Sequence, residues 1–332
     1  MKTDGHRDIS CSSILAQQIT EYVELKRACG YKFDQETYYL NKFDMLCAQE
    51  NLDSISIPDE ILKKWEQKTE GENETTHQHR VRIVRAFSSF LHNNDFDAPC
   101  TFHPLPKRNR DFVPYIFSMD EIRVFFRSLD NLTSGYIAIS PIRQYVVPVL
   151  FKTLYCCGLR LSEATHIKKE CVDYNDRTIK ILNSKGDKDR IVVMSQSLKD
   201  TLKSYSLRPE VRDFESEYLF PSPDHQAYVN YAIYETFRKA LLLAGIPHRG
   251  RGKGPRVHDL RHSFAVHVLS KWQKEGKDLY VCLPVLSAYL GHENLKMTET
   301  YLRLVPETYA ELTNAFENAH KTLFPEVQDE AE

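Results

Sequence analysis

The sequence predicts a mainly α-helical protein with one small antiparallel β-sheet, an α+β fold divided into two domains. Apolar residues recur at helical spacing over most of the 332 residues, which is typical of amphipathic helices. Two segments, 177–182 and 189–194, instead alternate apolar and polar residues and are joined by NSKGDK, the pattern of a β-hairpin. Residues 99–116 carry prolines and basic side chains without periodicity, which indicates a basic linker between the domains.

The first predicted domain, residues 1–98, is a small helical unit. Gly30 and the run GENETT at 71–76 interrupt its apolar pattern, as glycine and polar turn residues do between helices. The four segments with helical spacing are 14–25, 39–47, 61–65 and 81–91.

The second predicted domain, residues 117–332, is larger and contains the hairpin. Ser118 and Glu121 have the spacing of a capping box and mark the start of its first helix. Further helices are expected at 141–156, 227–244, 258–271, 283–290 and 307–320.

The composition favours an intracellular protein. The eight cysteines are scattered through apolar helical patterns and none forms a C-x-x-C pair, so neither a disulfide framework nor a cysteine zinc site is predicted. No stretch reaches the roughly 18 consecutive apolar residues of a membrane span, and the polar N-terminus lacks a signal-peptide core. We therefore expect a cytoplasmic protein that does not act at a membrane and uses neither a metal nor another cofactor.

Basic residues are concentrated in three runs, although the formal net charge is −2. The runs at 79–85, 106–110 and 248–256 are offset by an acidic tail at 325–332. Because nucleic-acid binding depends on where positive charge sits, the near-neutral total does not exclude it. The basic residues expected to contact DNA are Arg80, Arg82, Arg85, Lys107, Arg108, Arg110, Arg249, Arg251, Lys253 and Arg256.

Two motifs in the first half of the second domain carry candidate site residues. Arg160 and Glu163 lie in GLRLSEA, directly after a glycine that ends a helix. Lys185 lies in the predicted hairpin turn, where a lysine can reach into a DNA groove and protonate a leaving oxygen. Taken singly, each of these residues is typical of an exposed surface or turn. Lys188 and Arg190 lie close by and leave the choice of the lysine open.

A third motif, VHDLRHSFAVH, brings His258 and Arg261 to one face of a helix through their spacing of three. The basic, glycine-rich loop before this helix predicts a phosphate site at its N-terminus. His262 and His267 raise the alternative of a metal site. Their spacing of five does not place both on one face, which disfavours zinc.

A fourth motif, LGHENLKMTETYLRL, contains His292 and Tyr301. A single tyrosine on a helix usually belongs to a core or an interface, so the argument depends on the whole ordered set. Two arginines can hold a phosphodiester, two histidines can move protons at its oxygens, and a tyrosine can attack it covalently. Fixed cations then stabilise the charge that develops on phosphorus.

Together, these motifs resemble those of the tyrosine recombinases, or phage-type integrases, including the two-domain Xer-like enzymes. The resemblance covers about 115–305, and the hairpin SKGDKDRIVVM resembles the lysine motif of the family. It implies a helical core-binding domain followed by a catalytic domain. It also implies that Tyr301 is the nucleophile, Lys185 the general acid and Glu163 the support of the first arginine. By the same resemblance the phosphate is held by Arg160 and Arg261 and assisted by His258 and His292.

The resemblance further implies a site-specific DNA recombinase that forms a 3′-phosphotyrosyl intermediate and exchanges strands through a Holliday junction. Protomers that are monomeric in solution would form a homotetramer on double-stranded DNA sites in the nucleoid. Accessory proteins are further expected partners. The expected purpose is integration of a mobile element or resolution of chromosomes or plasmids. The C-terminal helix would dock on a neighbouring protomer or pack on its own domain through Leu312, Phe316, Leu323 and Phe324.

Three other activities compete with this interpretation. A type IB topoisomerase uses the same phosphotyrosine chemistry but relaxes DNA as a monomer. A non-catalytic DNA-binding relative would lack a catalytic residue, and the motifs here contain each of them. An unrelated hydrolase would use the histidines to bind a metal.

Overall fold

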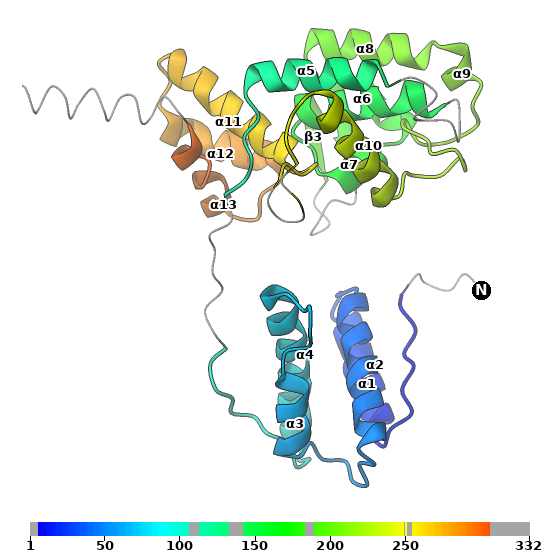
Figure 1. Cartoon of the computed structure of the whole chain (residues 1–332), viewed down its shortest axis with the longest axis vertical. Helices are drawn as coiled ribbons and strands as arrows, with labels where there is room; N and C mark the ends of the chain where they lie inside the picture. Colours follow the sequence, from blue (N-terminus) through cyan, green and yellow to red (C-terminus); the bar gives the residue numbers. More distant parts are fainter. Residues whose placement is uncertain are drawn as a thin grey trace, which may run out of the picture. The chain divides into compact units, whose positions relative to one another are not determined.

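The computed structural model describes residues 6–105, 113–132, 142–182, 189–248, 250 and 254–305. The chain divides into two compact units, Met1–Asp111 and Phe112–Glu332 (Figure 1). Several predictions fall outside the described residues: the helix at 307–320, with Leu312 and Phe316, and Leu323 and Phe324 beyond it. The same is true of Lys185, Lys107, Arg108, Arg110, Arg249, Arg251 and Lys253.

The N-terminal unit is a bundle of helices that pack on one another (Figure 1). Phe43 and Phe87 are fully buried in its core, and the ring of Trp65 lies edge-on to Phe43. The four helices that the sequence predicts are confirmed: α1 (Ala16–Ala28), α2 (Asp34–Gln49), α3 (Asp59–Glu66) and α4 (Glu74–His92).

The second unit is built around α6 (Arg143–Cys156), which contacts helices on several sides. Its near-continuous apolar sequence places Val147, Leu150 and Phe151 in the core, as expected for a helix that is covered all round. The capping box predicted at Ser118 is present. The surrounding helices are α5 (Met119–Asp130), α7 (Leu161–Thr165), α8 (Gln196–Ser206), α9 (Pro209–Arg212), α10 (Asn230–Leu243), α11 (Asp259–Lys274), α12 (Leu279–Leu290) and α13 (Lys296–Glu299).

Helix α8 is a finding that the sequence interpretation did not include. Its signal was present: Leu198, Leu202 and Tyr205 have helical spacing and are buried, and the Ser195 side chain caps the first turn by accepting from the Leu198 N–H. The short helices α7, α9 and α13 contain one turn or little more, which is too short for a periodic pattern to reveal.

The sheet confirms the predicted hairpin and adds one strand. Its order is β1 (Val172–Asp173), β2 (Thr178–Ile181), β3 (Arg190–Val193), with both pairs antiparallel. Strand β1 has two residues, so alternation could not predict it. Ile179 and Val192 face the core, and the other face of the hairpin is exposed.

Two glycines end the helices on which the candidate site depends. Gly158 follows α6 with φ +58°, and Gly291 follows α12 with φ +66°. This left-handed conformation is easily adopted only by glycine. A Cβ at position 158 would also lie 2.4 Å from the Phe264 ring and 3.1 Å from Leu290, so the turn allows α11 and α12 to approach closely.

We predict that Gly158→Ala lowers the free energy of unfolding by about 2–4 kcal/mol, because it combines backbone strain with overpacking. Gly245→Ala is the matched control, since Gly245 has φ +68° but a Cβ there meets nothing within 4 Å. Urea unfolding followed by circular dichroism measures both. Equal losses in the two variants would contradict the steric part of the prediction.

Candidate active site

Glu163 is the centre of a buried cluster of charges. This carboxylate on α7 accepts the Arg160 backbone N–H at 2.8 Å and the Arg160 side chain at 2.7 Å. Arg190 at the start of β3 donates both terminal nitrogens to it, at 2.9 and 2.8 Å. Arg261 on α11 lies 3.8 Å from the same carboxylate. One side chain therefore joins two helices and the hairpin.

The same arginines are held on their other sides by backbone carbonyls at helix ends. Arg261 donates to Gly158 O at 2.9 Å and Leu290 O at 2.6 Å, and Arg160 donates to Gly291 O at 3.0 Å. Arg190 donates to Tyr289 O at 2.9 Å. The last carbonyls of a helix have no partner within the helix and carry its negative dipole. The ends of α6 and α12 thus orient the guanidinium groups in a fixed geometry.

The cluster is positively charged even after its internal pairing. Burial raises the pKa of Glu163, but the hydrogen bonds from Arg190 and the Arg160 N–H outweigh this and hold it at about 2. Burial, together with the charge of Arg160, lowers the pKa of Arg261 to about 10, so it stays protonated at neutral pH. Three guanidinium groups against one carboxylate leave two positive charges, which suits a bound phosphate.

Two histidines of the predicted set border this cluster. His258 is the residue before α11, and His292 follows Gly291, with its Nδ1 2.7 Å from Thr298 Oγ1. Burial and the charge of Arg261 lower the pKa of each to about 4. Both imidazoles are therefore neutral at pH 7 in the protein by itself.

Tyr301 is also part of this site. Its side chain is 3% exposed, and its hydroxyl lies 2.9 Å from Nδ1 of His262. The His292 ring is stacked on the Tyr301 ring with 6.1 Å between centroids. Burial raises the pKa of Tyr301, and the charge of Arg261 offsets part of that rise. The fold thus brings together Arg160, Glu163, His258, Arg261, His292 and Tyr301, while Lys185 lies outside the described residues.

Two residues of the site could not be assigned from the sequence. The motifs indicate Arg190 only as a neighbour of Lys185, and nothing in a strand pattern reveals that its side chain reaches Glu163. His262 enters the sequence interpretation only as a possible metal ligand. It contacts Tyr301, and His267 contacts the Tyr155 hydroxyl at 2.8 Å. Within the described parts of the chain, no group of three or more His, Cys, Asp or Glu side chains could hold a metal ion.

Comparison with known proteins decides the family. The phage integrase family matches residues 128–307, which is more than half of the chain. The chain belongs to this family. A putative integrase/recombinase of Sinorhizobium fredii is 29% identical over 312 residues, covering 92% of this chain and 98% of that protein. Tyrosine recombinase XerC of Staphylococcus saprophyticus is 25% identical over 85% of this chain and 88% of its own length.

Solved structures of integrases share the fold. The XerH site-specific recombinase bound to a palindromic difH substrate has a TM-score of 0.64 at 20% identity, covering 93% of this chain and 86% of that one. The Tn1549 transposon integrase in complex with circular intermediate DNA has a TM-score of 0.60 at 16% identity, covering 86% of this chain and 93% of its own. The predicted family and fold class are confirmed. The protein is a site-specific tyrosine recombinase acting on DNA.

The basic residues predicted to contact DNA differ in their burial and in their ion-pair partners in this recombinase. Arg80 is a correction: its side chain is buried, pairs with Glu72 at 2.7 Å and donates to carbonyls of α3 and the following loop, so it stabilises the N-terminal bundle. Arg85 pairs with Glu66 at 2.6 Å. Arg82 is exposed, and Arg256 is part-exposed and pairs with Asp259 at 2.9 Å. The prediction for Arg82, Arg85 and Arg256 stays a prediction.

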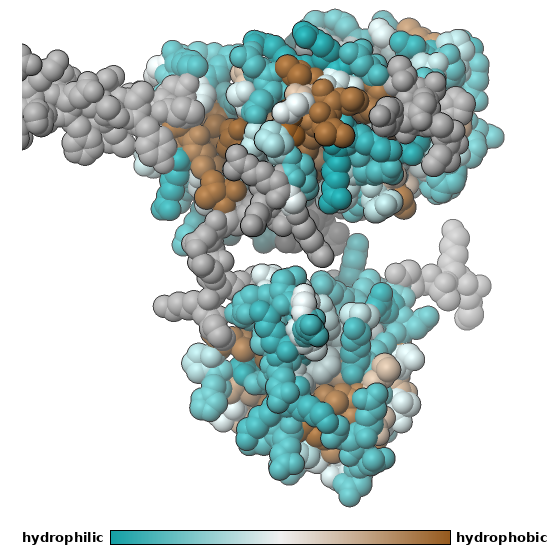
Figure 2. All heavy atoms as spheres, in the orientation of Figure 1, coloured by the Kyte–Doolittle hydropathy of each residue, from teal (hydrophilic) through white to brown (hydrophobic). Residues whose placement is uncertain are grey.

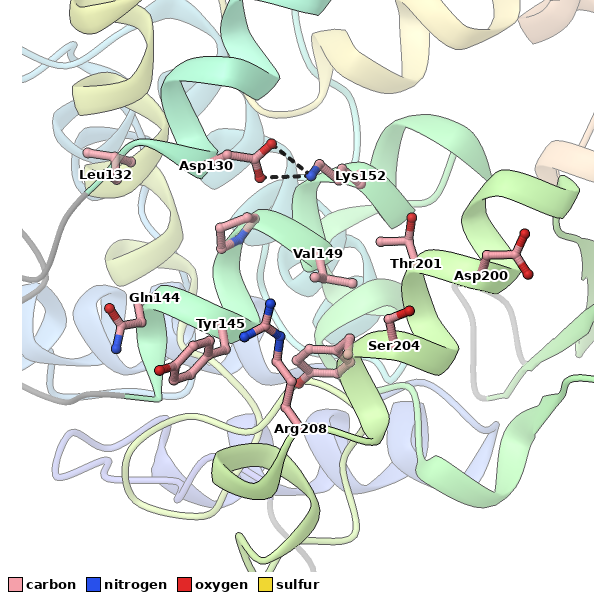
Figure 3. Close-up of a pocket in the computed structure, with 12 residues that line it drawn as sticks. Asp130, Leu132, Gln144, Tyr145, Val149, Lys152, Asp200, Thr201, Ser204 and Arg208 are labelled. Carbon is pink, nitrogen blue, oxygen red and sulfur yellow. Dashed lines mark hydrogen bonds and ion pairs between the residues drawn. The ribbon is translucent and has the colours of Figure 1, made fainter.

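A cavity of about 820 Å³ lies among α5, α6 and α8 of the recombinase (Figure 3). Lys152 pairs with Asp130 on one side of it, and Arg208 lies over the Tyr145 ring on another. None of the predicted site residues lines it. The reactive groups are therefore gathered at the arginine cluster and not in this cavity.

Across the described residues, no helix combines the length and apolar character that a membrane crossing requires.

We predict that the site makes the fold sensitive to mild acid. His292 has a pKa of about 4 in the folded protein and about 6.5 when unfolded, and His262 about 3. Between these values the unfolded chain binds more protons, so the free energy of unfolding falls as pH drops from 6.5 to 4. After allowance for solvent screening we expect a loss on the order of 1–2 kcal/mol.

Urea unfolding at pH 7 and pH 5 measures this loss. His292→Asn should reduce the difference between the two pH values, because it removes one of the groups that titrates. Phosphate should also reduce it by stabilising the protonated imidazoles. A pH difference that is the same in His292→Asn and in the wild type would contradict the assignment to this histidine.

Proposed function

We propose that the arginine cluster binds the scissile phosphate and that Tyr301 attacks it, giving a 3′-phosphotyrosyl intermediate. The single observation that supports this is the Tyr301 hydroxyl buried beside a cluster with two uncompensated positive charges. Arg160 and Arg261 hold the phosphate, oriented by Glu163. A phosphate that enters exchanges its water shell for fixed guanidinium groups, which stabilise the additional charge of the transition state.

In this proposal, His258 and His292 assist at the non-bridging oxygens. Their depressed pKa values rise when the phosphate charge enters, so each can then carry a proton. Lys185 is the general acid that protonates the departing 5′-oxygen. This role is supported by Arg190, five residues after Lys185 in the sequence, because its side chain is fixed to Glu163 in the cluster.

The strand exchange that follows needs more than one protomer. We propose that four copies assemble on two double-stranded DNA sites and exchange strands through a Holliday junction. The XerH and Tn1549 structures named above contain DNA, which supports DNA as the partner. Residues 1–98 form one half of a DNA clamp and 117–332 the other, joined by the basic linker at 99–116. The reaction serves a mobile element or the resolution of chromosomes or plasmids, with accessory proteins as further partners.

An apolar stripe on α12 supports self-association. Helix α12 packs on α11, but its apolar side chains Tyr280, Val281 and Val285 are exposed. Apolar atoms lie open at the position of α12 and α13 in Figure 2. The segment after Val305 contains Leu312, Phe316, Leu323 and Phe324. We propose that this segment of one copy covers the stripe of the next, since an apolar surface of this kind is typical of protein interfaces.

The function is tested with a pool of nicked suicide DNA duplexes of randomised sequence. Wild-type protein should form a covalent adduct with a subset, and sequencing of the trapped DNA identifies the site. Tyr301→Phe should form no adduct because it removes the attacking oxygen, while its DNA binding and thermal stability stay close to wild type. An adduct formed by Tyr301→Phe would show that the nucleophile is a different residue.

Assembly is tested separately by Val285→Asp, which places a charge in the α12 stripe. We expect sedimentation to show smaller complexes on the selected DNA, with DNA binding by single protomers unchanged. Leu242→Asp on α10 is the control, because Leu242 is similarly exposed but lies outside the stripe. Complexes of wild-type size in Val285→Asp would contradict this interface.

A further inference from the structure

The hydroxyl of Tyr301 has a partner that the predicted set does not contain. Its oxygen lies 2.9 Å from Nδ1 of His262, and the two rings lie 5.5 Å apart between centroids. His262 is in the first turns of α11, directly after Arg261, and is largely screened from solvent. The contact is therefore made by a helix that the arginine cluster already fixes in place.

The surroundings of His262 indicate the direction of this hydrogen bond. Burial, then the neighbouring His258 and Arg256, lower the pKa of His262 to about 3, with smaller effects from Arg261 and His292. The imidazole is thus neutral and has one nitrogen able to accept. Arg261 also faces the Tyr301 oxygen and favours its negative form. Because the Arg261 guanidinium is only a donor, the Tyr301 O–H cannot point to it and instead points towards Nδ1 of His262.

The two histidines of the predicted set are differently engaged. Nδ1 of His292 lies 2.7 Å from the Thr298 hydroxyl, and its ring is stacked on that of Tyr301 with an offset, at an interplanar angle of 27° and 6.1 Å between centroids. His258 lies edge-on to His262 with 4.7 Å between ring centroids. The Tyr301 hydroxyl is thus hydrogen-bonded to the neutral imidazole of His262, while the Arg261 guanidinium, which has no group that can accept a proton, hydrogen-bonds to it as well.

We propose that His262 is the catalytic base that takes the phenolic proton from Tyr301 during strand cleavage and returns it during rejoining. The proposal rests on Tyr301 being the nucleophile. The proton moves from the Tyr301 oxygen to Nδ1, the bond between that oxygen and phosphorus forms, and the bond from phosphorus to the 5′-oxygen breaks. The 5′-oxygen takes a proton from the general acid. Rejoining reverses each transfer, so protons and charge balance over the cycle.

Phosphate binding explains how such a weak base becomes effective. In the free protein, burial and the charges of Arg256 and Arg261 disfavour a proton on His262. A phosphodiester in the arginine cluster adds negative charge close by and reverses this effect. The transfer is therefore favoured only when DNA occupies the site, which protects the free enzyme from forming a reactive phenolate.

The first experiment compares His262→Asn with wild type in single-turnover cleavage. The substrate is the duplex selected above, made with a 5′-bridging phosphorothiolate so that a general acid is not needed. We expect adduct formation to slow by about 10²-fold or more, as for loss of a general base. Incorporation of 3,5-difluorotyrosine at position 301 lowers the phenol pKa and should restore most of the rate in His262→Asn. It should change the wild-type rate only slightly.

His267→Asn is the matched control, because His267 is on the same helix and its Nδ1 also lies beside a tyrosine hydroxyl, that of Tyr155. It should cleave at close to the wild-type rate. A wild-type rate in His262→Asn, or a slow rate that difluorotyrosine does not restore, would overturn the role of His262 as base. Adduct formation by Tyr301→Phe would instead overturn the nucleophile, so the two failures are distinguishable.

A second measurement needs no DNA and reads the protonation state of His262 in the wild-type protein. In the ¹⁵N spectrum of histidine-labelled protein, assigned by comparison with His262→Gln, Nδ1 of His262 should lack a proton and Nε2 should carry it. Vanadate, used as a phosphate mimic, should raise the pH at which this imidazole becomes protonated. A proton on Nδ1 in the free protein, or a titration that vanadate leaves unchanged, would overturn the proposal.

Discussion

The structure of the site depends on one carboxylate. Glu163 is buried and binds Arg160, Arg190 and, at longer range, Arg261, which come from α7, β3 and α11. A buried carboxylate is costly unless it is paired, and buried arginines are equally costly without it. Each partner therefore holds the others in place. Removal of Glu163 would leave three guanidinium groups in mutual repulsion, and the geometry that receives a phosphate would be lost.

Backbone carbonyls at helix ends make the other contacts that hold the arginines in place. The carbonyls of Gly158, Leu290 and Gly291 accept from the arginines at the points where α6 and α12 stop. A glycine in the left-handed conformation follows each helix, which exposes its last carbonyls. The site is thus assembled from groups that ordinary helices leave unpaired, and its rigidity derives from the packed core of the unit.

The excess positive charge of the arginine cluster links its geometry to the proposed proton transfers. Three arginines and one carboxylate give the cluster an excess of positive charge, and burial together with neighbouring charges keeps the nearby histidines neutral. In the proposed mechanism, the negative charge of a bound phosphate offsets the excess positive charge and also raises the pKa values of the histidines. In the mechanism that we propose, proton transfer therefore depends on DNA, because the groups that handle protons acquire suitable pKa values only when the substrate is bound.

The sequence by itself determined the helical fold class, the hairpin, the four helices of the N-terminal unit and the family. These follow from periodicity and from motifs that are local along the chain. The six site residues Arg160, Glu163, His258, Arg261, His292 and Tyr301 were also named from their motifs. Helix α8 was missed although its signal was present, and β1 was too short to give one.

Only the tertiary structure decided which side chains meet. Arg190 and His262 do not stand out in their local patterns, yet one reaches Glu163 from the hairpin and the other meets Tyr301 from 39 residues away. Arg80 shows the opposite case, since a basic run predicted a DNA contact and the fold buried the residue against Glu72. Residue type and spacing fix what a side chain can do, whereas burial and contacts between distant segments fix its partner, and these arise only when the chain is packed.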